Sequence, residues 1–171
     1  MKANGKLKTG DILHCHGKGW LSNIIGWFTK SWITHSGVVI EVWGQPYVID
    51  AQHNGVNPKP LEAWLKKYNY DIIVARPNVG PKDPRTFSIK AFMKVGLTGY
   101  DYKSLIIKQP WSLINKAWQI QKDDSSKMIC SEYVSWLYNI EKPYRITPAK
   151  LYDITQRGDF FHFLYEYSLD N

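Results

Sequence analysis

Cysteine is scarce in this sequence: its 171 residues include only Cys15 and Cys130. Two cysteines cannot form the disulfide framework that stabilises many small secreted domains. A single bridge is compatible with this count, but a reduced compartment is the simpler expectation. Each thiol is therefore either a small buried hydrophobic group or a candidate nucleophile.

Long apolar runs are absent. A transmembrane helix needs about 18 consecutive apolar residues, and no such run occurs, so we expect none. The basic N-terminal stretch MKANGKLKTGD (1–11) lacks the apolar centre of a signal peptide. We therefore expect a cytoplasmic protein by default, with export by another route or a phage origin as the alternative.

Acidic residues are outnumbered, with 15 Asp and Glu against 22 Lys and Arg and a net charge of +7. The excess favours an anionic partner such as an acidic wall polymer or a membrane surface. The basic residues are scattered, and the pair Lys66 and Lys67 is too short for a nucleic-acid patch. Because no nucleic-acid-binding motif is present either, we expect no nucleic-acid partner. We also expect no cofactor.

What the sequence does contain is enough apolar material for one folded domain spanning residues 1–171. Hydrophobic residues make up 44%, and the 8 Trp and 11 Tyr exceed what a core needs, which suggests a groove or an interface. The apolar spacing within 17–32 predicts a helix. That helix either packs on the core, as most amphipathic helices do, or touches lipid or lines a substrate groove.

Strand and helix patterns alternate along the chain and predict an α+β fold. We expect an antiparallel sheet that closes toward a small barrel, with the helix at 128–140 packed across it. Residues 43–46, WGQP, have the composition of a hairpin turn. The predicted strands are 9–16, 35–42, 47–51, 70–77 and 160–169; the predicted helices are 17–32, 61–68, 85–96, 128–140 and 147–155, with mixed helical stretches broken at Pro110 in 98–120.

Cys130 stands where the polar stretch 121–127 gives way to an apolar helical pattern. This places it in the first turn of a helix, where the helix dipole and unpaired N–H groups favour a thiolate. The thiolate, not the thiol, is the nucleophile. The alternative is an inert buried cysteine, as most free cysteines are.

His35 and Asp50 are polar residues in two otherwise apolar strands. A nucleophilic cysteine needs a base oriented by a third polar group. If the two strands form a hairpin, Asp50 can pair with His35 and fix its tautomer. Glu41 is the rival carboxylate, but at about 3.3 Å per residue it lies about 20 Å along the strand from His35. Cys130, His35 and Asp50 thus form a candidate triad.

Several short motifs then resemble, in order, those of the permuted papain-like cysteine hydrolases, the YiiX-like branch of the NlpC-type superfamily. They cover most of the chain. The histidine segment has the His-x-Gly pattern, and the cysteine opens an apolar helix. The matching segments are LKTGDIL (7–13), THSGVVIE (34–41), YVIDA (47–51), GYDY (99–102), ICSEYVSWLY (129–138) and ITPAKLYD (146–153).

The resemblance implies that Cys130 is the nucleophile, His35 the general base and Asp50 the orienting residue. Members of the branch often carry glutamate at the third position, where this chain has aspartate. The implied activity is cleavage of an amide or ester bond in a small amide, a peptide or an acylated molecule, including peptidoglycan stem peptides. The alternatives are a lipid-directed acyltransferase or thiolesterase, with peripheral membrane contact through 19–30, and a catalytically silent binding module.

His14, Cys15 and His16 suggest a metal site. On a strand His14 and His16 share one face while Cys15 points to the other. A structural zinc site needs four ligands, and His53 is the only further candidate nearby, so we expect no metal. We expect the histidine face to border the active site and Cys15 to pack inward. His162, within an aromatic run, is expected to be structural.

Overall fold

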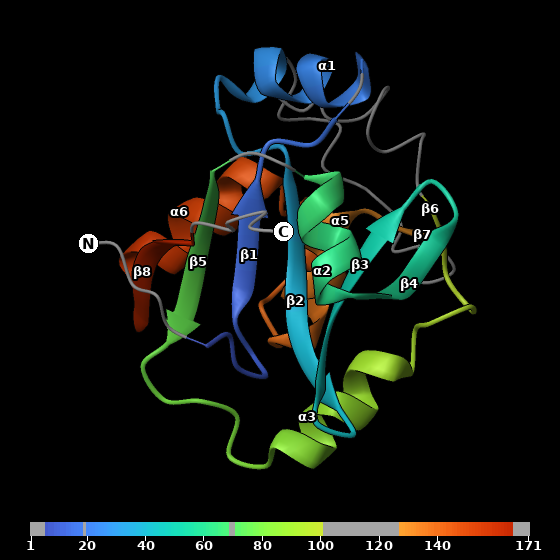
Figure 1. Ribbon diagram of the computed structural model, residues 1–171. Coiled ribbons are helices and arrows are strands. Elements are labelled where there is room, and N and C mark those ends of the chain that lie inside the picture. Colours follow the sequence, from blue (N-terminus) through green and yellow to red (C-terminus); the bar gives the residue numbers. More distant parts are fainter. Residues whose placement is uncertain (1–5, 19, 69–70, 101–126, 166–171) are drawn as a thin grey trace.

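A computed structural model describes residues 6–18, 20–68, 71–100 and 127–165. Its centre is a six-stranded sheet with the order β4-β3-β2-β1-β5-β8, and every neighbouring pair in it is antiparallel (Figure 1). The strands are β1 (Ile12–Cys15), β2 (His35–Val42), β3 (Gln45–Gln52), β4 (Gly55–Pro60), β5 (Ile72–Pro77) and β8 (Phe160–Tyr165). The predicted α+β class and antiparallel sheet are confirmed.

The predicted closure toward a barrel is wrong for the part of the chain that the structure describes. The sheet is open, and β4 and β8 are its two edges. Strand β4 was also missed by the sequence analysis, because Pro58 and Pro60 argue against a strand. Proline lacks an N–H donor and is tolerated mainly in edge strands, so the same two residues limit further pairing at this edge.

Most predicted helices are confirmed, with shifted ends. The described helices are α1 (Trp20–Thr29), α2 (Leu61–Lys67), α3 (Pro84–Phe92), α5 (Cys130–Leu137), the 3₁₀ helix η3 (Pro143–Arg145) and α6 (Pro148–Arg157). Two short strands, β6 (Gly99–Tyr100) and β7 (Lys127–Met128), pair in parallel, and β7 lies immediately before α5 in the chain. The predicted stretches after position 100, with the break at Pro110, lie outside the described residues. None of the described helices has the length and apolar character that crossing a membrane requires.

The β2–β3 hairpin has a tighter turn than predicted. Val42 pairs with Gln45, so only Trp43 and Gly44 form the loop. Both have positive φ, 49° and 76°, as a type I′ turn requires. The hairpin register follows from this turn and brings Val38 opposite Ile49 near the far end.

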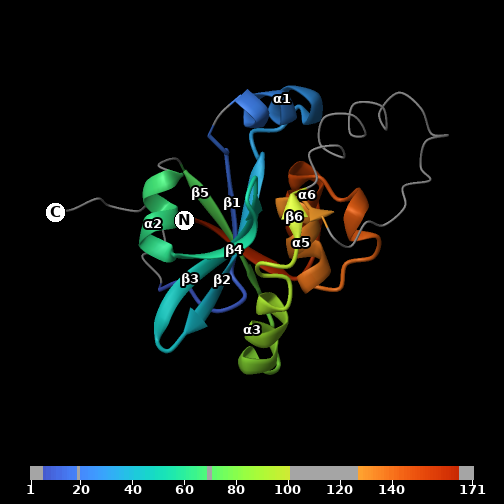
Figure 2. The ribbon, with the colours of Figure 1, turned by 90° about the vertical axis from the view of Figure 1, so that its right-hand side faces the viewer.

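Helices cover both faces of the sheet (Figure 2). On one face α2 packs through Trp64 and Leu65 onto a cluster that includes Val39 and Val48. On the other, α5, α6 and α3 pack onto the residues of alternate parity. These include Val38, Ile40, Ile49 and Ala51 from the sheet, with Ala91, Tyr133, Val134, Leu137 and Leu151 from the helices. Because strand side chains alternate between faces, His35 and Asp50 lie on the α2 face.

Candidate active site

His35 is the first residue of β2, and β2 begins at the end of the sheet near α1 (Figure 1). The chain is fixed there by Thr34, whose N–H donates to the Cys15 carbonyl at 3.1 Å and whose hydroxyl accepts from the Gly17 N–H at 2.8 Å. His35 is 8% exposed. The strand end therefore holds a buried imidazole whose orientation depends on its polar partners.

Asp50 provides one of those partners. The His35 Nε2 atom lies 2.8 Å from Asp50 Oδ2. Asp50 is fully buried on β3, so an ionised carboxylate there needs strong partners. Gly37 lies on the same face of β2 as His35, and a Cβ at Gly37 would lie 2.6 Å from Val48 Cγ1 and 3.4 Å from the Cβ of Asp50. The missing side chain at Gly37 leaves room for Asp50 beside the hairpin.

Three donors meet on one oxygen of Asp50. Besides His35, the Trp64 indole Nε1 donates to Oδ2 at 2.8 Å and the Gln52 amide Nε2 donates at 2.7 Å. No donor among the described residues makes a hydrogen bond to Oδ1, and Lys59 Nζ lies 4.0 Å away. Burial raises the pKa of Asp50, but the hydrogen bond and charge of His35, with Lys59 and Gln52, bring it below its usual value. Asp50 is therefore ionised at neutral pH.

Aromatic rings from the end of α2 cover the imidazole. The Tyr68 ring stacks on His35 with centroids 4.8 Å apart and planes 16° apart, and the Trp64 ring lies at 6.3 Å and 27°. The negative face of an aromatic ring stabilises a cation placed over it. These rings exclude water from the His35–Asp50 pair and favour the charged imidazolium.

Cys130 begins α5, where the prediction placed it, and is 2% exposed. Neighbouring side chains fix this helix: the Ser131 hydroxyl donates to the Ile146 carbonyl at 2.6 Å and the Tyr133 hydroxyl to the Ala91 carbonyl at 2.9 Å. The Glu132 carboxylate accepts from the Ile129 N–H at 3.4 Å. The cysteine thus stands at a helix N-terminus where backbone N–H groups have no intrahelical acceptor.

The structure brings Cys130 and His35 within interaction distance. Burial alone lowers the pKa of His35. The charge of Cys130, together with hydrogen bonds to Asp50 and Cys130 and the charge of Asp50, outweighs burial and raises this pKa to about 9. Because Nε2 faces Asp50, Nδ1 is the ring nitrogen left for the sulfur. A protonated imidazole between a carboxylate and a sulfur can transfer a proton to a leaving group.

The other candidate residues lie apart from this group. Glu41 and His53 are exposed. His16 contacts the Trp32 carbonyl through Nδ1 at 2.9 Å. His162 contacts Thr155 through Nε2 at 3.1 Å. Asp101 and Tyr102 of the GYDY segment lie outside the described residues.

Of the two predictions for β1, the inward packing of Cys15 is confirmed, but the prediction that the histidine face borders the candidate site is wrong. Cys15 pairs with His35 across the strands, and its side chain packs on the α2 face. Burial, with the charges of Cys130 and Asp50, raises its pKa well above the usual value. His14 instead points to the other face, where it contacts Ser36 and Thr155. Cys15 does pack inward, but it, rather than the histidines, borders the candidate site.

Gln52, Trp64 and Tyr68 were not predicted as site residues from the sequence. The available signals were spacing alone: Gln52 shares a strand face with Asp50 at i+2, and Trp64 and Tyr68 share a helix face at i+4. Neither spacing by itself indicates a hydrogen bond, and the contacts of Trp64 and Tyr68 depend on how α2 packs on the sheet.

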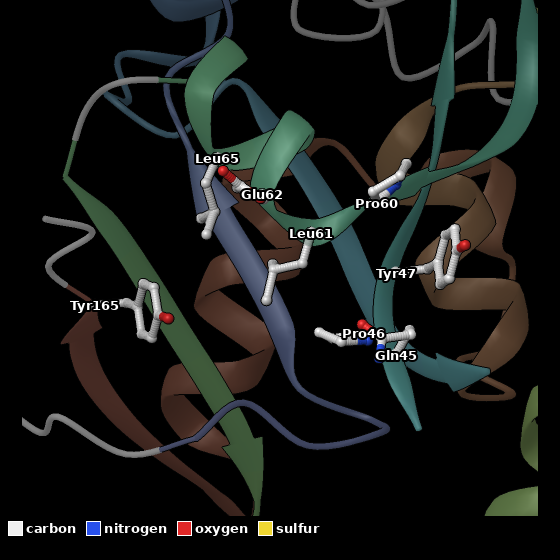
Figure 3. Close-up of a pocket in the computed structure, with 8 residues that line it drawn as sticks. All are labelled: Gln45, Pro46, Tyr47, Pro60, Leu61, Glu62, Leu65 and Tyr165. Carbon is white, nitrogen blue, oxygen red and sulfur yellow. The ribbon is translucent and has the colours of Figure 1, made fainter. Parts of the chain in front are cut away.

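A cavity of about 300 Å³ also lies on the α2 face (Figure 3). It is open to solvent between the start of β3, the first turn of α2 and the end of β8. None of the candidate triad residues lines it. The lining residues are Gln45, Pro46, Tyr47, Pro60, Leu61, Glu62, Leu65 and Tyr165.

The sequence matches no family model, and no curated protein matches it. Among solved structures, it is similar to that of the metalloprotein YiiX from Escherichia coli O157:H7. The two share 17% sequence identity with a TM-score of 0.71, over 94% of this chain and 98% of that chain. The chain has a YiiX-like fold.

The description of YiiX as a metalloprotein applies to that protein. Within the described ranges of this chain, no three His, Cys, Asp or Glu side chains are grouped so that they could hold a metal ion. His14 and His16 point to different partners, Ser36 and the Trp32 carbonyl. The residues described here therefore do not fit a metal site of the YiiX-like fold.

Proposed function

We propose that this protein is a permuted papain-like thiol hydrolase in which Cys130 is the nucleophile, His35 the general acid and base, and Asp50 the orienting residue. The observation that carries the proposal is the 2.8 Å contact between His35 Nε2 and Asp50 Oδ2, with Cys130 interacting with the same ring. A catalytic triad is defined by the spatial arrangement of its nucleophile, base and orienting group, and not by their order along the chain. The YiiX-like fold is compatible with it.

In the proposed reaction the Cys130 thiolate attacks the carbonyl carbon of an amide or ester. The C–S bond forms, and the oxyanion is stabilised by N–H groups at the start of α5, including that of Cys130. The bond to the leaving amine or alcohol then breaks as His35 donates its proton. The neutral imidazole next takes a proton from water, whose oxygen attacks the thioester and releases the acid. Asp50 stays ionised throughout and holds the ring.

Peptides of the cell wall are the substrate class that we favour. A net charge of +7 favours anionic polymers, and amide bonds of peptidoglycan stem peptides suit a thiol nucleophile. An acyltransferase or thiolesterase acting on lipid esters would use the same acyl-enzyme and differ only in substrate and acceptor.

Selective alkylation tests the nucleophile without a known substrate. We expect iodoacetamide at about pH 6 to modify Cys130 well before Cys15, because only a thiolate reacts and burial raises the pKa of Cys15. Peptide mapping by mass spectrometry measures the two rates in the same sample. Equal, slow modification of both cysteines contradicts the proposal.

An acyl trap then identifies the substrate class. The protein is incubated with a panel of stem peptides and lipid esters and quenched in acid, and mass spectrometry locates the adduct. We expect the adduct on Cys130 and its complete loss, with turnover, in Cys130→Ala, whereas Cys15→Ala retains both. Turnover that survives Cys130→Ala overturns the assignment. Products formed on an added amine or alcohol, rather than on water, identify an acyltransferase.

A catalytically silent binding module is the second candidate, favoured by the low exposure of Cys130 at 2%. An enclosed sulfur packs as a small hydrophobic group. This candidate predicts that Cys130 resists alkylation at every pH at which the protein stays folded, and that no acyl adduct forms with any member of the panel.

A further inference from the structure

Gln52 connects the candidate triad to helix α2. Its amide Nε2 donates to Asp50 Oδ2 at 2.7 Å and to the Tyr68 hydroxyl at 3.0 Å. Its carbonyl Oε1 accepts from Lys67 Nζ at 2.5 Å. Gln52 is 7% exposed, whereas Lys67 is at the surface. A continuous path of hydrogen bonds therefore runs from a surface ammonium through a buried amide to the carboxylate beside His35.

The direction of this path follows from donor and acceptor chemistry. A lysine ammonium can only donate, and an ionised carboxylate can only accept. The Gln52 amide satisfies both only with Oε1 toward Lys67 and Nε2 toward Asp50. The flipped amide would place oxygen against oxygen at Asp50 and nitrogen against nitrogen at Lys67. Lys67 thus selects the orientation in which Gln52 stabilises the negative charge of Asp50.

We propose that Gln52 is a positioning residue for the His35–Asp50 pair, and that Lys67 acts through Gln52 by fixing its amide. This inference rests on the proposed function for its catalytic meaning, because Gln52 and Lys67 touch neither the sulfur nor a substrate. Its effect is on the charge of Asp50, which a merely structural glutamine would not change.

Losing the Gln52 donor makes Asp50 easier to protonate. The Gln52 hydrogen bond helps to lower the pKa of Asp50, so the carboxylate of a variant without it accepts a proton at a higher pH. The support for His35 is present above that pKa and is lost as the pH falls through it. The other titratable groups that influence or are influenced by Asp50 are His35, Lys59, Cys15 and Tyr133. None of them is substituted in the test, although Lys67→Met also removes a charge that lowers the pKa of Lys59.

The test compares Gln52→Leu, Lys67→Met and Lys66→Met with the unmodified chain. Lys66 is the matched control, because its ammonium pairs with Glu62 at 2.7 Å on the surface of the same helix. Two quantities are followed against pH: the carboxyl carbon NMR signal of Asp50 and the alkylation rate of Cys130 by iodoacetamide. Circular dichroism at each pH confirms that the protein is folded.

We expect the acid half-points of both curves to move up by about one pH unit in Gln52→Leu, a tenfold change in proton affinity. Lys67→Met moves them in the same direction by less, and Lys66→Met leaves them in place. If Gln52→Leu does not fold, the acid half-points of Lys67→Met and Lys66→Met still test the proposal. Unchanged half-points in folded Gln52→Leu, or equal shifts in the two lysine variants, overturn the proposal.

These outcomes are separate from those of the proposed function. If Cys130 of the unmodified chain alkylates no faster than Cys15, thiol catalysis fails while the Asp50 signal still reports on Gln52. If Cys130 reacts selectively and the Asp50 signal titrates unchanged in Gln52→Leu and Lys67→Met, the proposed triad is supported and the Gln52 proposal fails.

Discussion

Two buried histidines on neighbouring strands have pKa values that are shifted in opposite directions. His14 on β1 pairs with Ser36 on β2, and the next pair along the strands is Cys15 with His35. The rings therefore lie on opposite faces of the same sheet. Burial, with the charge of His162, lowers the pKa of His14 to about 3, whereas that of His35 rises to about 9.

The partners account for the difference, since both rings are desolvated. Among the described residues, the ring nitrogens of His14 contact two hydroxyls, Ser36 Oγ at 2.9 Å and Thr155 Oγ1 at 3.4 Å, which serve a neutral ring well because each can donate or accept. The Tyr152 ring packs edge-on at 5.4 Å. His35 contacts a carboxylate and a sulfur, which favour a cation. Burial alone thus makes a structural histidine, and burial beside a carboxylate makes one that can transfer a proton.

Exchanging the carboxylate for an amide should remove part of this difference. In Asp50→Asn the pKa of His35 falls from about 9 toward the ordinary 6.5, because the ring loses one of its two anionic partners and keeps Cys130. We expect the alkylation of Cys130 near pH 7 to slow at least about tenfold. Histidine NMR titration and peptide mapping measure the two effects.

Ser36→Ala is the matched change on the other face. It removes the hydroxyl partner of His14 and should cost about 1–3 kcal/mol of unfolding free energy, because a buried ring nitrogen loses its hydrogen bond. His14 should stay neutral and Cys130 should react as before.

A His35 pKa that remains near 9 in Asp50→Asn would show that Cys130 alone sets it.

The sequence could predict the two strands, the helix that starts at Cys130 and the pairing of His35 with Asp50 as a hypothesis. Each rests on local information: apolar runs, a polar-to-apolar change before Cys130 and a lone carboxylate that needs a partner. The charge states of His14 and His35 could not be predicted, because they depend on which face of the sheet each ring takes and on what packs there.

The missed features are those set by packing between distant segments. Trp64 reaches the Oδ2 atom of Asp50 only because α2 lies on that face, whereas Gln52 is two residues from Asp50 on the same strand and depends on α2 for its contacts with Tyr68 and Lys67. The wrong prediction for the histidine face of β1 has the same origin: alternation along β1 was predicted, but which face met His35 depended on pairing with β2.

The opposite pKa shifts also predict opposite pH dependences of stability. The lowered pKa of His14 means that the unfolded chain binds the extra proton between about pH 6.5 and 3, so stability is lost as the pH falls through that range. The raised pKa of His35 gives stability that is complete below 6.5 and lost as the pH rises toward about 9. Each proton changes the slope of the unfolding free energy against pH by about 1.4 kcal/mol per pH unit.

Urea unfolding across the pH range measures both slopes. His14→Asn should flatten the acid side and leave the alkaline side, and His35→Gln, whose amide can still donate to Asp50, should do the reverse. A flattening of both sides by either variant would mean that the two rings titrate together rather than independently.

The last prediction concerns Gly37, which packs against Val48 and Asp50 on the neighbouring strand. Gly37→Ala places a Cβ 2.6 Å from Val48 Cγ1 and 3.4 Å from the Cβ of Asp50. Overpacking of this kind typically costs about 1–3 kcal/mol. Gly80→Ala is the control, because nothing lies within 4 Å of a Cβ there, and its unfolding midpoint should be unchanged.

The Gly37 variant separates packing from pairing. If the new methyl group displaces Asp50, the acid half-point of Cys130 alkylation moves up together with the loss of stability, because the carboxylate no longer meets His35 at 2.8 Å. A loss of stability with an unchanged alkylation curve would instead mean that Val48 absorbs the strain. In that case Gly37 is required for core packing and not for the pairing of His35 with Asp50.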